Sequence, residues 1–104
     1  MSEVTYDPMS NQPEKNKAKV TMYTTRFCPY CVRAKMLINQ KGVLLDEKAV
    51  DYKPALRQEM MKKSNRNTVP QIWIGDAHIG GCDELFMLER SGQLDSMLNQ
   101  NSET

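Results

Sequence analysis

Two cysteines separated by two residues, Cys28-Pro29-Tyr30-Cys31, are the part of this 104-residue sequence best suited to chemistry. A thiol pair at this spacing is typical of metal binding or of thiol–disulfide exchange. Cys28 falls between an expected strand and an expected helix, where unpaired backbone N–H groups and the helix dipole stabilise a thiolate. Cys31 lies one turn into that helix, on its apolar stripe. We therefore predict that Cys28 attacks a disulfide and that the sheltered Cys31 resolves the product.

Zinc binding and an inert structural disulfide are the competing interpretations of this pair. Further zinc ligands come only from Cys82 and His78, and neither has the spacing of the second pair of a zinc knuckle or finger. An inert disulfide is typical of secreted proteins, whereas three cysteines are too few, and odd in number, for a secreted disulfide scaffold. No metal is therefore expected, and redox catalysis is favoured.

The pattern of apolar residues predicts the elements that hold the cysteines. β-branched and aromatic residues indicate strands, and apolar residues three or four positions apart indicate helices. A strand–helix–strand unit sets its strands parallel, and a closing hairpin adds an antiparallel pair. The fold class is therefore α/β, with a four-stranded mixed sheet and helices on both faces. In order, we expect a strand over 19–24, a helix that begins at Pro29 and stops at Gly42, a strand over 43–50, a helix from Pro54, a hairpin over 71–79, a helix over 82–90 and one or two final turns over 94–98.

Length and charge exclude several classes of protein. The chain has room for one small domain, and 14 basic against 13 acidic residues give a net charge of +1, which favours neither nucleic acid nor an anionic membrane as partner. No apolar stretch approaches the ~20 residues of a membrane span, and the N-terminus has no secretory signal. We expect a cytoplasmic monomer with a flexible tail over 1–16, a domain over 17–100 and a C-terminal tail over 101–104. A short docking helix is the alternative for the first tail.

Three motifs together resemble the glutaredoxins, especially the bacterial dithiol members. They are Cys28-Pro29-Tyr30-Cys31 after a strand, Thr68-Val69-Pro70 before a hairpin, and Gly80-Gly81-Cys82-Asp83 at the start of the last helix. The resemblance covers 17–98. It implies a thioredoxin fold, a cis peptide bond at Pro70, and reduction of protein disulfides and protein–glutathione mixed disulfides with glutathione as co-substrate.

The same resemblance implies a set of glutathione contacts. Glutathione carries two carboxylates and one ammonium, so Arg57 can hold one carboxylate with forked hydrogen bonds. Backbone N–H groups of Cys82 and Asp83 can hold the other carboxylate, and the Asp83 side chain can meet the ammonium. The backbone at Val69 can pair with the extended peptide. The full implied set is Tyr30, Arg57, Thr68, Val69, Cys82 and Asp83, with Pro70 and Arg26 in structural roles beside it.

Some interpretations stay open at this point. Many glutaredoxins carry Lys three residues before the nucleophilic cysteine, where this chain has Thr25, and Arg26 is the nearest basic replacement. Cys82 is interpreted first as a small residue packed at a helix start, and otherwise as a site of glutathionylation or of an intermolecular disulfide. Two other functions are a [2Fe–2S] cluster shared between subunits, which Pro29 disfavours, and a thioredoxin, which usually carries Trp-Cys-Gly-Pro-Cys.

Overall fold

The computed structural model describes residues 18–99, and the predicted tails over 1–16 and 101–104 lie outside the described residues. Within the described part, no helix is long and apolar enough to span a membrane. The order of elements is the predicted one, and the expected final turns form a short helix. The elements are β2 (Val20–Thr24), α1 (Pro29–Gln40), β3 (Leu45–Ala49), α2 (Pro54–Ser64), β4 (Gln71–Ile74), β5 (Ala77–Gly80), α3 (Cys82–Ser91) and α4 (Gln93–Asn99).

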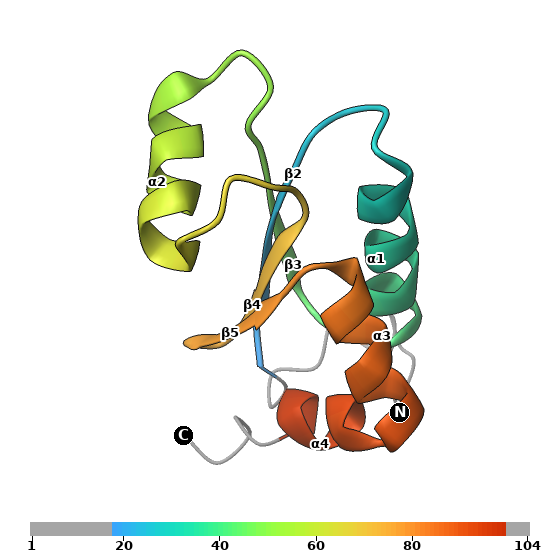
Figure 1. Cartoon of the computed structure of the whole chain (residues 1–104). Helices are drawn as coiled ribbons and strands as arrows, with labels where there is room; N and C mark the ends of the chain where they lie inside the picture. The colour runs from blue at the N-terminus through green and yellow to red at the C-terminus, as the bar shows by residue number, and fades with distance from the viewer. Residues whose placement is uncertain (1–17, 100–104) are drawn as a thin grey trace, which may run out of the picture.

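The four strands form one mixed sheet in the order β3-β2-β4-β5. β2 is parallel to β3 and antiparallel to β4, and β4 pairs with β5 as an antiparallel hairpin. Helices α1 and α3 cover one face of the sheet and α2 covers the other (Figure 1). The predicted mixed sheet with helices on both faces is confirmed.

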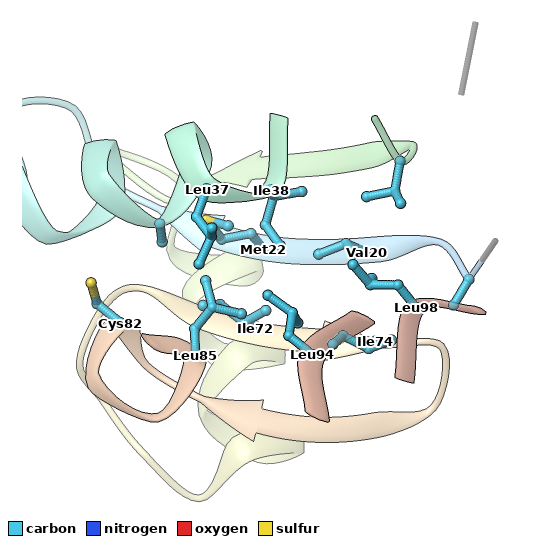
Figure 2. Packing of buried hydrophobic residues seen from close by; sticks show 13 residues of the cluster. Val20, Met22, Leu37, Ile38, Ile72, Ile74, Cys82, Leu85, Leu94 and Leu98 are labelled. Atoms are coloured by element: carbon cyan, nitrogen blue, oxygen red, sulfur yellow. The ribbon is translucent and has the colours of Figure 1, made fainter. Parts of the chain in front are cut away.

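The main core lies between the sheet and helices α1, α3 and α4 (Figure 2). Residues two apart on a strand share a face, so Val20 and Met22 point into this core, whereas Tyr23 points to the α2 side. Leu94 and Leu98 are also fully buried in it, and the Ala18 N–H donates to the Leu98 carbonyl at 2.8 Å. Burying such a leucine contributes about 1.5–3 kcal/mol, which stabilises the one or two expected final turns as helix α4.

A smaller core lies under α2, where Tyr23, Val50, Met60 and Trp73 are buried together. The neighbouring strand β3 lies at the edge of the sheet and is shorter than the predicted 43–50. Single backbone hydrogen bonds extend the pairing at both of its ends, from the Val20 N–H to the Leu44 carbonyl and from the Val50 N–H to the Thr24 carbonyl.

Candidate active site

One end of the sheet collects the three sequence motifs. The carboxyl ends of β2, β3 and β5 share this end with the amino end of β4, because β4 alone runs in the opposite direction. β2 leads into the cysteine motif, β4 follows Pro70, and β5 leads into α3 at Cys82. The topology therefore brings segments from distant parts of the chain to one site.

The two cysteines of the motif occupy different environments, as the sequence predicted. Cys28 is the N-cap of α1, with extended backbone (φ −100°, ψ 112°) and a partly exposed side chain. Pro29 begins the helix, where its missing N–H leaves no intrahelical hydrogen bond unmade. Cys31 is 1% exposed. The burial of Cys31, followed by a hydrogen bond to Cys28 and the charge of Cys28, raises the pKa of the Cys31 thiol to about 12. Cys31 is therefore a protonated thiol near neutral pH.

A pocket of about 320 Å³ lies beside the motif. It brings together five of the six predicted glutathione contacts, together with Pro70. The peptide bond between Val69 and Pro70 is cis, which confirms the isomer that the family resemblance implies. The residues that line the pocket are Tyr30, Arg66, Thr68, Val69, Pro70, Gly81, Cys82, Asp83 and Glu84.

A buried carboxamide fixes the wall of the pocket at Thr68. Gln71 is fully buried on β4, and its Nε2 donates to the Thr68 carbonyl at 3.0 Å and to Thr68 Oγ1 at 3.2 Å. Gln71 Oε1 lies 2.8 Å from His78 Nε2, so the proton of this hydrogen bond comes from the histidine. Sequence reasoning missed Gln71, although a polar residue inside a buried apolar strand must find hydrogen-bond partners.

The start of α3 forms the opposite wall, and glycine allows it to come close to Pro70. A Cβ atom added at Gly81 would lie 3.3 Å from the Pro70 carbonyl oxygen. The Gly81 N–H donates to Glu84 Oε1 at 2.7 Å, and this hydrogen bond holds the pKa of Glu84 below its usual value. Glu84 Oε2 is also 3.6 Å from Arg66 Nη1. Sequence analysis missed Arg66 and Glu84, although a glutamate three residues after an N-cap is a known capping signal.

Arg57 lies outside the residues that line this pocket. Its Nε donates to Asn67 Oδ1 and its Nη2 to the Asn67 carbonyl, both at 3.1 Å. Arg57 therefore braces the residue just before Thr68. Its predicted contact with glutathione stays a prediction.

Arg26 contacts the loop between β3 and α2. Its backbone N–H donates to both carboxylate oxygens of Asp51, at 3.1 and 3.0 Å, and its guanidinium lies 5.9 Å from the centre of the Tyr52 ring. The contacts of Arg26 therefore tie two loops together at the active-site end.

Cys82 packs both in the main core and at the pocket wall, and burial raises the pKa of its thiol. This placement agrees with the interpretation of Cys82 as a small residue packed at a helix start, while its modification stays a prediction. Among residues 18–99, no group of three or more His, Cys, Asp or Glu side chains is placed to hold a metal ion.

The glutaredoxin family model matches residues 20–79. The chain belongs to the glutaredoxin family. It is 56% identical over 80 residues to a glutaredoxin of Pseudomonas aeruginosa, an alignment that covers 77% of this chain and 95% of the relative. It is 52% identical over 81 residues to glutaredoxin 3 of Escherichia coli K12, covering 78% and 98%. A crystal structure of a buckwheat glutaredoxin–glutathione complex superposes with a TM-score of 0.74 at 30% identity, covering 83% of this chain and 81% of that one.

Membership of this family confirms two further predictions. The mixed sheet and its helices form the thioredoxin fold that glutaredoxins share. The activity of the family is glutathione-dependent thiol–disulfide oxidoreduction, so this glutaredoxin is an enzyme of that class.

Proposed function

We propose that Cys28 is the nucleophile of this glutaredoxin, that Cys31 is its resolving thiol, and that its substrates are disulfide-bonded and glutathionylated proteins. The observation that carries this proposal is the contrast between the two thiols. Cys28 is partly exposed at a helix N-terminus, whereas Cys31 is buried one turn away with the pKa of its thiol raised to about 12. Only the first can reach an incoming disulfide.

The pocket beside the cysteines has the groups that glutathione requires. Backbone N–H groups of Cys82 and Asp83 at the start of α3 suit one carboxylate, and the exposed Asp83 carboxylate suits the ammonium. In this proposal the backbone at Val69, in the pocket wall, pairs with the extended peptide. Tyr30 and Thr68 complete the contacts in the pocket. Arg57 is hydrogen-bonded to Asn67, the residue before Thr68, and takes the second carboxylate.

Deglutathionylation needs only Cys28. The Cys28 thiolate attacks the glutathione sulfur of a protein–glutathione mixed disulfide, so the Cys28–glutathione bond forms as the old disulfide bond breaks. The protein sulfur leaves as a thiolate and takes a proton from solvent. A second glutathione thiolate then attacks the glutathionyl sulfur on Cys28, which releases glutathione disulfide and restores the Cys28 thiolate.

Reduction of a protein disulfide also needs Cys31. Attack by Cys28 links it to one target sulfur and releases the other as a thiolate. The hydrogen bond and the charge that Cys28 contributes are then lost, which removes two of the causes that raise the pKa of Cys31. Cys31 attacks the Cys28 sulfur, its proton passes to the second departing target sulfur, and the Cys28–Cys31 disulfide forms. Two glutathione molecules then restore both thiols and leave as glutathione disulfide.

The cellular compartment and the oligomeric state of the enzyme are part of the same proposal. Three cysteines in a chain of 104 residues, with two of them in a redox motif, suit a reducing compartment, and we assign the protein to the cytoplasm. We further propose a monomer that requires no metal, with a catalytic domain over 17–100.

Two cysteine variants test the assignment of roles. Cys28→Ser is expected to abolish reduction of a protein disulfide and of a cysteine–glutathione mixed disulfide in an assay coupled to glutathione reductase. Cys31→Ser is expected to lose the first activity and to retain the second, because only the first needs a resolving thiol. Retained deglutathionylation in Cys28→Ser would overturn the assignment.

A further inference from the structure

Two aromatic side chains at the active-site end of the sheet are almost completely exposed. Phe27 is 96% exposed and Tyr52 is 91% exposed, more than any other large apolar side chain among residues 18–99. They lie on the β2–α1 loop and the β3–α2 loop, which rise side by side above the sheet (Figure 1). Arg26 joins these loops through Asp51 and the Tyr52 ring. We call Arg26, Phe27, Asp51 and Tyr52 the aromatic rim.

The backbone of the aromatic rim is strained at both rings. Phe27 has a φ of 62° and Tyr52 a φ of 59°, in the left-handed region that glycine occupies freely and bulky residues rarely adopt. The only other described non-glycine residue there is Asn65, a type that tolerates this conformation. Neither ring is buried among the described residues, and the Arg26 guanidinium is the group that contacts the Tyr52 ring there. Backbone strain of this kind is found where function requires a side chain in a fixed position.

The rim is separate from the glutathione pocket but adjoins the reacting sulfur. Neither Phe27 nor Tyr52 lines the pocket, whereas Phe27 immediately precedes Cys28. In both reactions the target sulfur lies next to Cys28, either bonded to it or leaving from the glutathione sulfur that Cys28 attacks. The residues on either side of the target cysteine therefore come close to this loop. Because neither ring lines the pocket, glutathione bound there and a target segment on the rim can occupy the same complex.

We propose that the aromatic rim binds the polypeptide segment that flanks the reacting cysteine of a target protein. This proposal rests on the function proposed above and adds a basis for selecting targets. The rings suit an apolar side chain beside that cysteine. The exposed cations Arg26 and Lys53 outnumber the single carboxylate of the rim, Asp51, so they favour an acidic residue next to it. A target segment of small neutral residues gains none of these contacts.

The test compares substrates that differ only beside the cysteine. Two synthetic peptides carry one glutathionylated cysteine, flanked by Leu and Asp in the first and by Gly and Ser in the second, and a cysteine–glutathione mixed disulfide is the small reference. For Phe27→Gly and for Tyr52→Gly, kcat/KM on the Leu/Asp peptide is expected to fall about tenfold, as for removal of an aromatic from an interface centre. On the small reference it should change less than about twofold, because the catalytic thiols and the pocket are intact.

The melting temperature of each variant is the second measurement. Because glycine relieves the left-handed backbone, Tyr52→Gly is expected to keep or raise the melting temperature while it weakens the peptide reaction. Asparagine tolerates the same backbone, so Tyr52→Asn should lower kcat/KM on the Leu/Asp peptide in the same way. Leu44→Ala is the matched control, because Leu44 is half-exposed at the opposite end of β3.

Each outcome has one meaning. An unchanged kcat/KM on the Leu/Asp peptide, or equal losses on all three substrates, would overturn the role of the rim in target binding. A wild-type enzyme that fails on the small reference would instead contradict the proposed function, so the two failures are distinguishable.

Discussion

The buried Cys31 thiol makes the reduced protein less stable at alkaline pH, by an amount that can be worked out. In the unfolded chain this thiol ionises around its ordinary pKa of 9.0, and in the folded protein its pKa is raised to about 12. Between these values the folded state holds one proton more than the unfolded state, so the free energy of unfolding falls as pH rises. The contribution of the Cys31 thiol to the free energy of unfolding is fully present below pH 9. From pH 8 to pH 10, integration gives a loss of about 1.4 kcal/mol from Cys31 alone.

Urea unfolding of the reduced protein at pH 8 and pH 10 measures this loss. Cys31→Ala removes the titrating group, so the variant should lose about 1.4 kcal/mol less than the wild type over the same interval. Burial also raises the pKa of Cys82, but Cys82 is present in both proteins and cancels in the comparison. Cys28→Ser should keep most of the loss in unfolding free energy between pH 8 and pH 10, because burial is the largest cause of the raised pKa of Cys31 and remains in this variant. Equal losses in wild type and Cys31→Ala would refute the picture of Cys31 as a buried, protonated thiol.

Two further substitutions probe the walls of the pocket. Gln71→Met removes three hydrogen bonds of a fully buried carboxamide, so we expect a loss of about 2 kcal/mol in urea unfolding and a raised KM for glutathione with kcat little changed. A KM equal to that of the wild type would show that Thr68 keeps its position without Gln71. Arg57→Ala removes the proposed carboxylate ligand and should raise the KM for glutathione about tenfold in steady-state kinetics. An unaffected KM would contradict the glutathione contact and leave the Arg57 side chain only its two hydrogen bonds to Asn67.

The periodicity of the sequence predicts most of the fold, because burial imposes it directly. Val20 and Met22 alternate with Tyr23 across the two faces of β2, and Leu37 and Ile38 lie on the buried side of α1. The exact length of β3 could not be predicted, because the pairing of an edge strand depends on the strand beside it rather than on its own apolar pattern. The completion of α4 depends likewise on the core into which Leu98 packs.

The candidate site was predictable where chemistry is local and not where it depends on contacts between distant segments. The difference between Cys28 and Cys31 follows from their positions at a helix start, and the structure places them accordingly. Arg66 and Glu84 meet at the pocket although they are eighteen positions apart in the sequence, and the linear pattern of residues does not show that they are close in space. The sequence also gives no sign of the left-handed backbone of Tyr52, because tyrosine seldom adopts this conformation.

The central claim is that Cys28 carries the glutathionyl group during turnover. Mass spectrometry of peptides from the Cys31→Ser variant, after incubation with a cysteine–glutathione mixed disulfide and no free glutathione, tests it most directly. The expected result is one glutathionyl group on the peptide that contains Cys28 and an unmodified Cys82. An adduct on Cys82 with Cys28 still free would contradict the account.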